Sequence, residues 1–194
     1  MIKEYTLNPL HLLACLPHVD ESHKNNSLRH VYIGDGYICA SNGHTMLMID
    51  DESVKGCDYL IPTIALRELD DALDRATDIG FKLFVYSNER AAFSMPGCPD
   101  INFELSQLKR INYKKADIAK PSQFINERPV FNPRLLMLFQ VSFEYLTGCS
   151  DMGICLHTQG LTDSAYVEMF DDVHGVIKPM YVSKSPELIV EAVQ

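Results

Sequence analysis

Residues 35–50, DGYICASNGHTMLMID, contain the side chains that most invite a chemical interpretation. Ser41 lies three residues before His44, and a hydroxyl beside an imidazole is the start of a nucleophilic site. Cys39 precedes the same histidine and Cys57 follows it, which raises a metal site as the second chemical interpretation. Neither one matches a recognised pattern, because the sequence has no GxSxG elbow and no familiar pair of metal ligands.

No GxxxxGK[ST] or GxGxxG run offers a cradle for phosphate groups. We therefore predict no catalytic residue, no bound metal and no cofactor. An enzyme that uses Ser41, His44 and a carboxylate is kept as a hypothesis that ranks below the two given at the end of this section. His44 then has two other interpretations. It is either a turn residue whose imidazole bonds to nearby backbone, or part of one wall of a groove that receives another protein.

The composition is that of a folded protein without a membrane segment. Of the 194 residues, 46% are hydrophobic and 22% are charged, so a packed core is expected. No apolar run approaches the ~20 residues of a membrane helix, and the first residues, MIKEYTLNPL, do not resemble a signal peptide. Six scattered cysteines without a CxxC pair favour reduced thiols, and hence the cytoplasm.

The charge pattern limits how the chain could contact nucleic acid. A net charge of -9 argues against a protein that coats DNA with its whole surface, but not against a local basic strip. The most basic segment is LKRINYKKADIAK, residues 108–120. It is either a solvated linker or a DNA-binding strip. The DNA-binding candidates are Lys109, Arg110, Lys114, Lys115 and Lys120.

The first half of the chain is expected to alternate short strands with helices. Residues 3–7 predict a strand, and Asn8-Pro9 then caps a helix with Leu10, Leu13 and Leu16 on its apolar side. Residues 20–30 are polar and predict a loop. Two glycine turns, at 34–36 and 42–43, join predicted strands at 31–33, 37–40 and 45–49, and another strand is expected at 59–61.

One pattern occurs twice. A helix is predicted from Pro62 to Gly80, and strands at 81–86 and 91–95 follow it. A second strand, Val130-Phe131, leads into a helix from Pro133 to Gly148, with strands at 153–157 and 165–170. The repeat predicts an α+β fold of two similar modules, each with a helix packed on an antiparallel sheet. We divide the chain into module 1 (1–98), a connector with the basic segment (99–128), and a compressed module 2 with a C-terminal extension (129–194).

The stretch 31–49, VYIGDGYICASNGHTMLMI, resembles the middle domain of the bacterial sliding clamp, the beta subunit of DNA polymerase III, where an ATDGHRLA-like segment is found. Further segments resemble the same family in the same order, over residues 31 to 182. They are YLIPTIALRELDDAL, FKLFVYSNERAAFSM, CPDINF, FNPRLLMLF, LTDS and GVIKPMYV.

The resemblance implies DNA-clamp modules that form a ring of six, with helices facing double-stranded DNA. Such a protein is a non-enzymatic processivity factor that tethers DNA polymerase and other replication proteins. Two modules per chain would require a homotrimer, and the short chain suggests a phage or mobile-element version. The alternative is a clamp-fold protein-binding module, or clamp mimic, that does not encircle DNA. The acidic residues after Pro62 favour this alternative.

The resemblance also implies a groove for partner peptides. The family's arginine after the histidine is Thr45 here, its second FPDYRR arginine is Phe103, and its terminal methionine before proline is Lys178. These departures change the charge and shape of the groove. Carried over by position, the groove residues are Ser41, Gly43, His44, Thr45, Met46, Pro99, Phe103, Val176, Lys178, Pro179 and Met180.

Overall fold

The computed structural model describes residues 2–73, 80–122, 129–151 and 153–180. Within them the chain forms three α-helices and eleven strands. The helices are α1 (Pro9–Cys15), α2 (Thr63–Leu73) and α3 (Pro133–Thr147). The strands are β1 (Lys3–Thr6), β2 (His30–Gly34), β3 (Tyr37–Ser41), β4 (Thr45–Asp50), β5 (Asp58–Pro62), β6 (Lys82–Val85), β7 (Arg90–Ser94), β8 (Ile101–Glu104), β9 (Cys155–His157), β10 (Ala165–Glu168) and β11 (Val173–Ile177).

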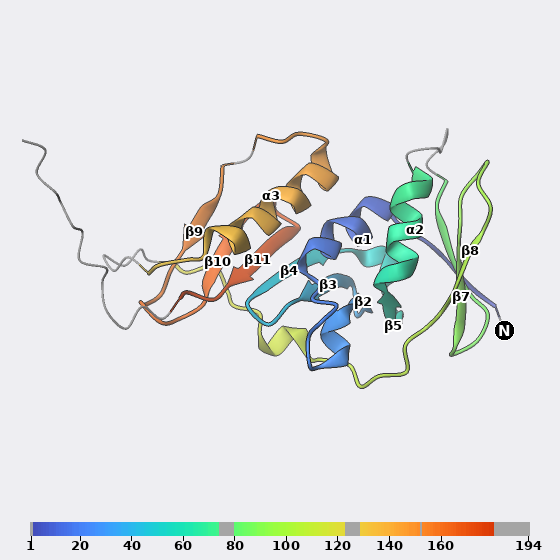
Figure 1. The fold of residues 1–194 in the computed structure, drawn as a ribbon, viewed down its shortest axis with the longest axis horizontal. Helices are drawn as coiled ribbons and strands as arrows, with labels where there is room; N and C mark the ends of the chain where they lie inside the picture. The colour runs from blue at the N-terminus through green and yellow to red at the C-terminus, as the bar shows by residue number, and fades with distance from the viewer. Residues whose placement is uncertain (1, 74–79, 123–128, 152, 181–194) are drawn as a thin grey trace, which may run out of the picture.

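The predicted α+β class is confirmed: the strands form two antiparallel sheets, and the three helices lie together on one side of them (Figure 1). One sheet has the order β1-β6-β7-β8, and the other has the order β5-β2-β3-β4-β11-β10-β9. The first ten elements are two interlocked βαβββ units, β1-α1-β2-β3-β4 and β5-α2-β6-β7-β8, because β1 pairs with β6 and β5 pairs with β2. A third unit, α3-β9-β10-β11, joins them through β11, which pairs with β4.

The repeat seen in the sequence therefore relates the second unit to the third. Residues 3–50 form a further unit of the same kind, which the sequence pattern did not reveal. The strand expected at Val130-Phe131 was wrong, because residues 129–132 do not form one. Among the described residues, the backbone bond from Met180 N to Val130 O (2.7 Å) is too little pairing to make a strand there.

The seven-stranded sheet is buried on both faces. On the helix side, Val31, Ile33 and Leu47 belong to a core that extends through all three units to Phe139 of α3. The intervening residues point to the opposite face, where they form a second apolar cluster under the connector. Its members are Leu28, Tyr32, Tyr37, Cys39, Met46, Met48, Leu60, Tyr113 and Val176, with Ile111 and Ile118 packed against them. Burial on both faces explains why these strands are continuous apolar runs.

The predicted helix ends are confirmed where the structure describes them. Asn8 and Asn132 each precede a proline, and their side chains accept bonds from Leu10 N and Arg134 N at 3.0 Å. Gly148 ends α3 in the left-handed conformation (φ 69°). Leu10 was expected in the apolar stripe of α1, but it is exposed, since the helix buries Leu12, Leu13, Ala14 and Cys15 instead. The predicted end of α2 at Gly80 adjoins residues 74–79, outside the described part of the chain.

None of the helices in the described ranges is both long and apolar enough to cross a bilayer.

Gly175 of β11 lies directly beneath the ring of Phe139, and this close approach generates a prediction. A Cβ at position 175 would overlap the ring, lying 2.9 Å from Cδ1 of Phe139. Gly175→Ala should lower the free energy of unfolding by about 1–3 kcal/mol, measured by urea denaturation, because the helix must shift off the sheet. Gly153→Ala is the matched control, since an added Cβ there meets no atom within 4 Å. Equal stability of both variants would contradict the packing.

Candidate functional site

The turn between β3 and β4 satisfies its backbone amides with its own side chains. The Ser41 hydroxyl donates to Thr45 O (2.7 Å) and accepts from Gly43 N (3.1 Å). Asn42 Oδ1 accepts from the amides of His44 (2.9 Å) and Thr45 (2.8 Å). Gly43 adopts a φ of 85°, which other residues rarely adopt. The turn is therefore rigid, and it leaves the side chain of His44 exposed.

Strand β11 brings residues 176–178 to this turn. Val176 lies opposite Met46 and Ile177 opposite Thr45, and Lys178 N donates to His44 O at 2.9 Å. Most of the predicted groove residues are thus neighbours in space. We define the docking corner as residues 41–44 together with Lys178, Pro179 and Met180.

The predicted groove differs from the structure in two ways. Pro99 and Phe103 do not lie at the corner: β8 carries Phe103 in the four-stranded sheet, opposite Ala91 and against Phe93, whereas the corner adjoins the middle strands of the seven-stranded sheet (Figure 1). Thr45, Met46 and Val176 are at the corner but are buried, so they support it from beneath. The exposed members are His44, Lys178 and Met180, the last with 48% of its surface accessible.

Thr45 has a structural partner that the sequence did not indicate. Its hydroxyl lies 2.9 Å from Nδ1 of His18, a fully buried histidine whose ring packs against Phe139. Nε2 of His18 is buried without a hydrogen-bond partner within the described structure. Burial lowers the pKa of His18 to about 3, because the charged imidazolium would lose its hydration. This histidine therefore remains neutral in the folded protein.

A cavity of about 530 Å³ opens beside the corner. Asn42 and His44 form one side of it, and the loop after α1 forms another, with Arg67 of α2 and Leu138 of α3. Two acidic residues face it, Asp20 and Glu21, and Glu21 is paired with Arg67 at 2.9 Å. The bond from Arg67 lowers the pKa of Glu21. Loop residues 20–22 were missed because their polarity predicted only solvent exposure. The lining residues are Pro17, Val19, Asp20, Glu21, Ser22, Asn42, His44, Arg67 and Leu138.

The predicted DNA-binding residues lie on the opposite side of the sheet from the helices. Residues 109–120 of the connector lie on that face, held by the buried side chain of Tyr113 and by a bond from Ser27 Oγ to Lys109 O (2.7 Å). Within the described residues, three of the five basic side chains have a partner. Arg110 pairs with Asp58, Lys114 lies 5.1 Å from the ring centre of Tyr37, and Lys120 pairs with Glu168 at 2.5 Å. Lys109 and Lys115 are exposed.

The two chemical interpretations of residues 35–50 find no support in the geometry. The Ser41 hydroxyl donates to the backbone of its own turn. Cys39 and Cys57 are buried on opposite faces of the sheet, in different apolar clusters. Within the described ranges, the residues that could together hold a metal are Cys155, His157 and Glu168, on β9 and β10.

At the sequence level, neither a protein-family model nor a curated protein matches the chain. Solved structures do. The sliding clamp of Bartonella birtlesii, solved bound to griselimycin, aligns with a TM-score of 0.71 at 16% identity, covering 92% of this chain and 66% of that chain. The DNA polymerase III beta subunit of Thermotoga maritima aligns with a TM-score of 0.69 at 12% identity, covering 94% and 66%. The chain has the sliding-clamp fold.

The same fold is found in the clamp of Caulobacter crescentus, solved with PEG at a putative beta-motif tethering region (TM-score 0.69, 12% identity, covering 93% of this chain and 67% of that one). This clamp-fold chain thus spans about two thirds of the length of the clamps it matches. The resemblance that the short motifs suggested is confirmed at the level of the fold.

The His18–Thr45 pair predicts how the stability of the clamp-fold core depends on pH. The folded-state pKa of His18, about 3, lies below the ordinary value of 6.5, so the unfolded chain binds a proton that the folded chain excludes. The contribution of neutral His18 to the free energy of unfolding is therefore complete above pH 6.5. It is lost as the pH falls towards 3, and the free energy of unfolding then falls by up to ~1.4 kcal/mol per pH unit. His18→Gln should flatten the slope between pH 6.5 and 4.5 in urea unfolding. His44→Gln, at an exposed site, should leave the slope as it is, and equal slopes in all three proteins would contradict the assignment.

Proposed function

We propose that the chain is a clamp-fold accessory to DNA replication that binds partner proteins at the docking corner and catalyses no reaction. The observation that carries this proposal is the pairing of β4 with β11, which places His44 and Lys178 on one rim. Exposed polar groups and Met180 on that rim, with a cavity of about 530 Å³ beside it, suit a short segment of another protein.

The known clamps support this role. Those of Bartonella birtlesii and Caulobacter crescentus have been solved with griselimycin and with PEG, and the latter occupies a putative beta-motif tethering region. We infer that the corner of this chain serves the same purpose with an altered surface, because Lys178 and Thr45 replace the residues expected there. The scattered thiols without a CxxC pair are in keeping with a protein that works in the cytoplasm.

The charge of the helix layer favours protein binding over encirclement of DNA. The described parts of α2 and α3 carry Arg67 and Arg134 against four carboxylates, and Arg67 is already paired with Glu21. A surface that slides along phosphates needs an excess of positive charge. The four carboxylates are Glu68, Asp70, Asp71 and Glu144.

Encirclement of double-stranded DNA is the second candidate function. It is favoured by the position of two edge strands, through which several chains could join into a ring. Strand β8 ends one sheet and β9 ends the other, and they lie at opposite ends of the molecule (Figure 1). Chains joined through such edges can assemble head to tail, and three chains of two modules each would make a ring of six.

Griselimycin is a direct probe of the docking corner. Lys178→Met removes a charge from the rim and restores the methionine expected there, so it should strengthen griselimycin binding by roughly tenfold in isothermal titration calorimetry, through added apolar contact. Lys55→Met changes another exposed lysine, outside the corner, and should have no effect. Equal binding by all three proteins, or none by any of them, would argue against a peptide-binding corner of the clamp type.

The second candidate makes a separate prediction. A ring should have a mass in solution near three times 21.9 kDa by light scattering, and should be retained on circular DNA but not on linear DNA. The double variant Lys114→Glu/Lys115→Glu should then weaken DNA association in a salt-dependent manner. A monomer or dimer without salt-sensitive DNA affinity would exclude the ring and leave the protein-binding module.

A further inference from the structure

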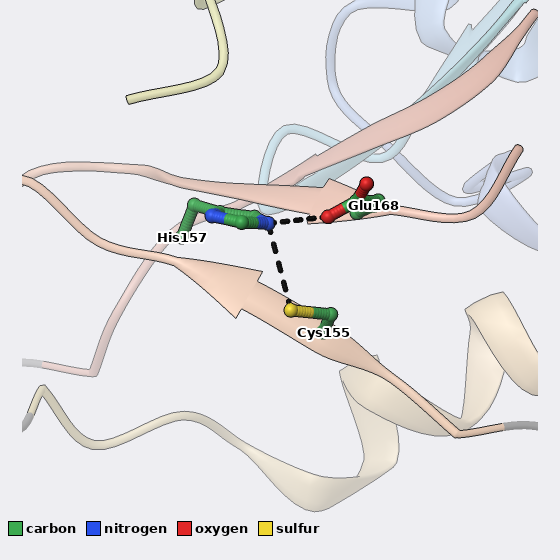
Figure 2. Close-up of side chains that lie close together, drawn as sticks. All are labelled: Cys155, His157 and Glu168. Carbon is green, nitrogen blue, oxygen red and sulfur yellow. Dashed lines mark hydrogen bonds and ion pairs between the residues drawn. The ribbon is translucent and has the colours of Figure 1, made fainter. Parts of the chain in front are cut away.

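Three side chains with different metal-binding atoms converge at the β9 edge of the seven-stranded sheet, and none of them belongs to the docking corner. Cys155 and His157 lie on β9, and Glu168 lies on the adjacent strand β10 (Figure 2). Sγ of Cys155 is 3.5 Å from Nε2 of His157, and the same nitrogen is 2.6 Å from Oε2 of Glu168. All three atoms lie within 4.8 Å of one another.

The strand geometry holds these residues on one face. Cys155 and His157 are two residues apart on one strand, so their side chains point the same way. Glu168 is directly opposite Cys155 in the antiparallel register, on that same face. The convergence therefore follows from the backbone pairing of the hairpin, and the side chains need not move far to meet.

The distances suit a tetrahedral metal. With a metal–sulfur bond of ~2.3 Å and a metal–nitrogen bond of ~2.0–2.1 Å, two ligands at the tetrahedral angle are roughly 3.6 Å apart. The sulfur and the imidazole nitrogen already have this separation, at 3.5 Å. The nitrogen and the carboxylate oxygen are in hydrogen-bond contact, and they need to separate by less than ~1 Å to hold an ion between them.

The surroundings hold the ligands without blocking the site. Lys120 Nζ contacts Oε1 of Glu168 at 2.5 Å, so the other carboxylate oxygen faces His157. The imidazole of His157 is buried, with 8% of its side chain exposed, whereas Cys155 and part of Glu168 are open to solvent. An ion can enter from the surface and meets a histidine whose position is fixed.

We propose that Cys155, His157 and Glu168 form a binding site for a divalent transition metal, and that Zn²⁺ is the ion that suits these ligands best. Thiolate, imidazole and carboxylate are the ligands of zinc sites, and three protein ligands leave one position for water or an incoming ligand. The metal replaces the hydrogen bond between His157 and Glu168. Cys155 releases its thiol proton, and Nε2 of His157 offers its lone pair, with any ring proton left on Nδ1 or released.

The proposed metal would cross-link β9 to β10, at a place separate from the docking corner. Strand β9 has three residues, and among the described strands it pairs with β10 alone. A metal bonded to both strands cross-links this edge, so metal binding should raise the stability of the folded chain. This site does not depend on the proposed function, because its ligands are not part of the corner.

Cobalt(II) tests the site in the full-length, reduced and metal-free protein. We expect one equivalent to produce a thiolate-to-cobalt charge-transfer band and the intense visible bands of four-coordinate cobalt, and Zn²⁺ to displace it. Zn²⁺ should also raise the unfolding temperature. Cys155→Ser should abolish the charge-transfer band, and His157→Gln and Glu168→Gln should each weaken binding at least ~10-fold. Binding should also weaken as the pH is lowered, since protons compete for the same atoms.

Two variants control for non-specific binding. Cys149→Ser removes the other exposed thiol of this region, and His23→Gln removes a histidine distant in sequence. Both should bind cobalt as the unaltered protein does. Because His157 is largely buried, circular dichroism must first show that His157→Gln is folded. If His157→Gln does not fold, the result for Cys155→Ser tests the proposal, because Cys155 is exposed. An absent charge-transfer band, or a band that survives in Cys155→Ser, would overturn the proposal.

Discussion

Strands β4 and β11 pair along five positions, from Thr45 opposite Ile177 to Ile49 opposite Val173. This pairing joins segments more than 120 residues apart and makes one seven-stranded sheet from what would otherwise be separate pieces. Phe139 of α3 can pack closely against β11 because residue 175 is glycine, and His18 packs against the same ring. The position of the third helix, the buried state of His18 and the rim at His44 all follow from the one pairing.

The connector has a structural role that its charge conceals. Its lysines and arginine suggest a flexible basic strip, yet Tyr113 is 1% exposed and packs near Tyr32. Ion pairs from Arg110 and Lys120 hold it at two further points, and His174 bonds to Asp117 at 2.8 Å. Exposed ion pairs contribute little each, so the apolar contacts of Tyr113, Ile111 and Ile118 are the main attachment.

Features set by neighbouring residues could be predicted from the sequence. The Asn-Pro helix starts, the Gly148 helix end and the turns at Gly36 and Gly43 depend on local geometry, and the short clamp-like motifs kept their order. Features set by distant segments could not. Leu10 is exposed because other helices cover the opposite side of α1, and Phe103 is far from the corner because β8 pairs with β7. Glu168 joins Cys155 only through the register of two strands, which no spacing rule in one sequence reveals.

The second apolar cluster gives the connector a role as a cover. If a protease cut the chain between residues 105 and 120 and this segment moved away, Tyr32, Met46 and Met48 would be exposed to water, because no other described segment covers that face of the sheet. An uncovered apolar strip of this kind promotes self-association. The same cut leaves the helix-side core intact. Cleavage of the connector would therefore yield a folded molecule that self-associates rather than an unfolded one.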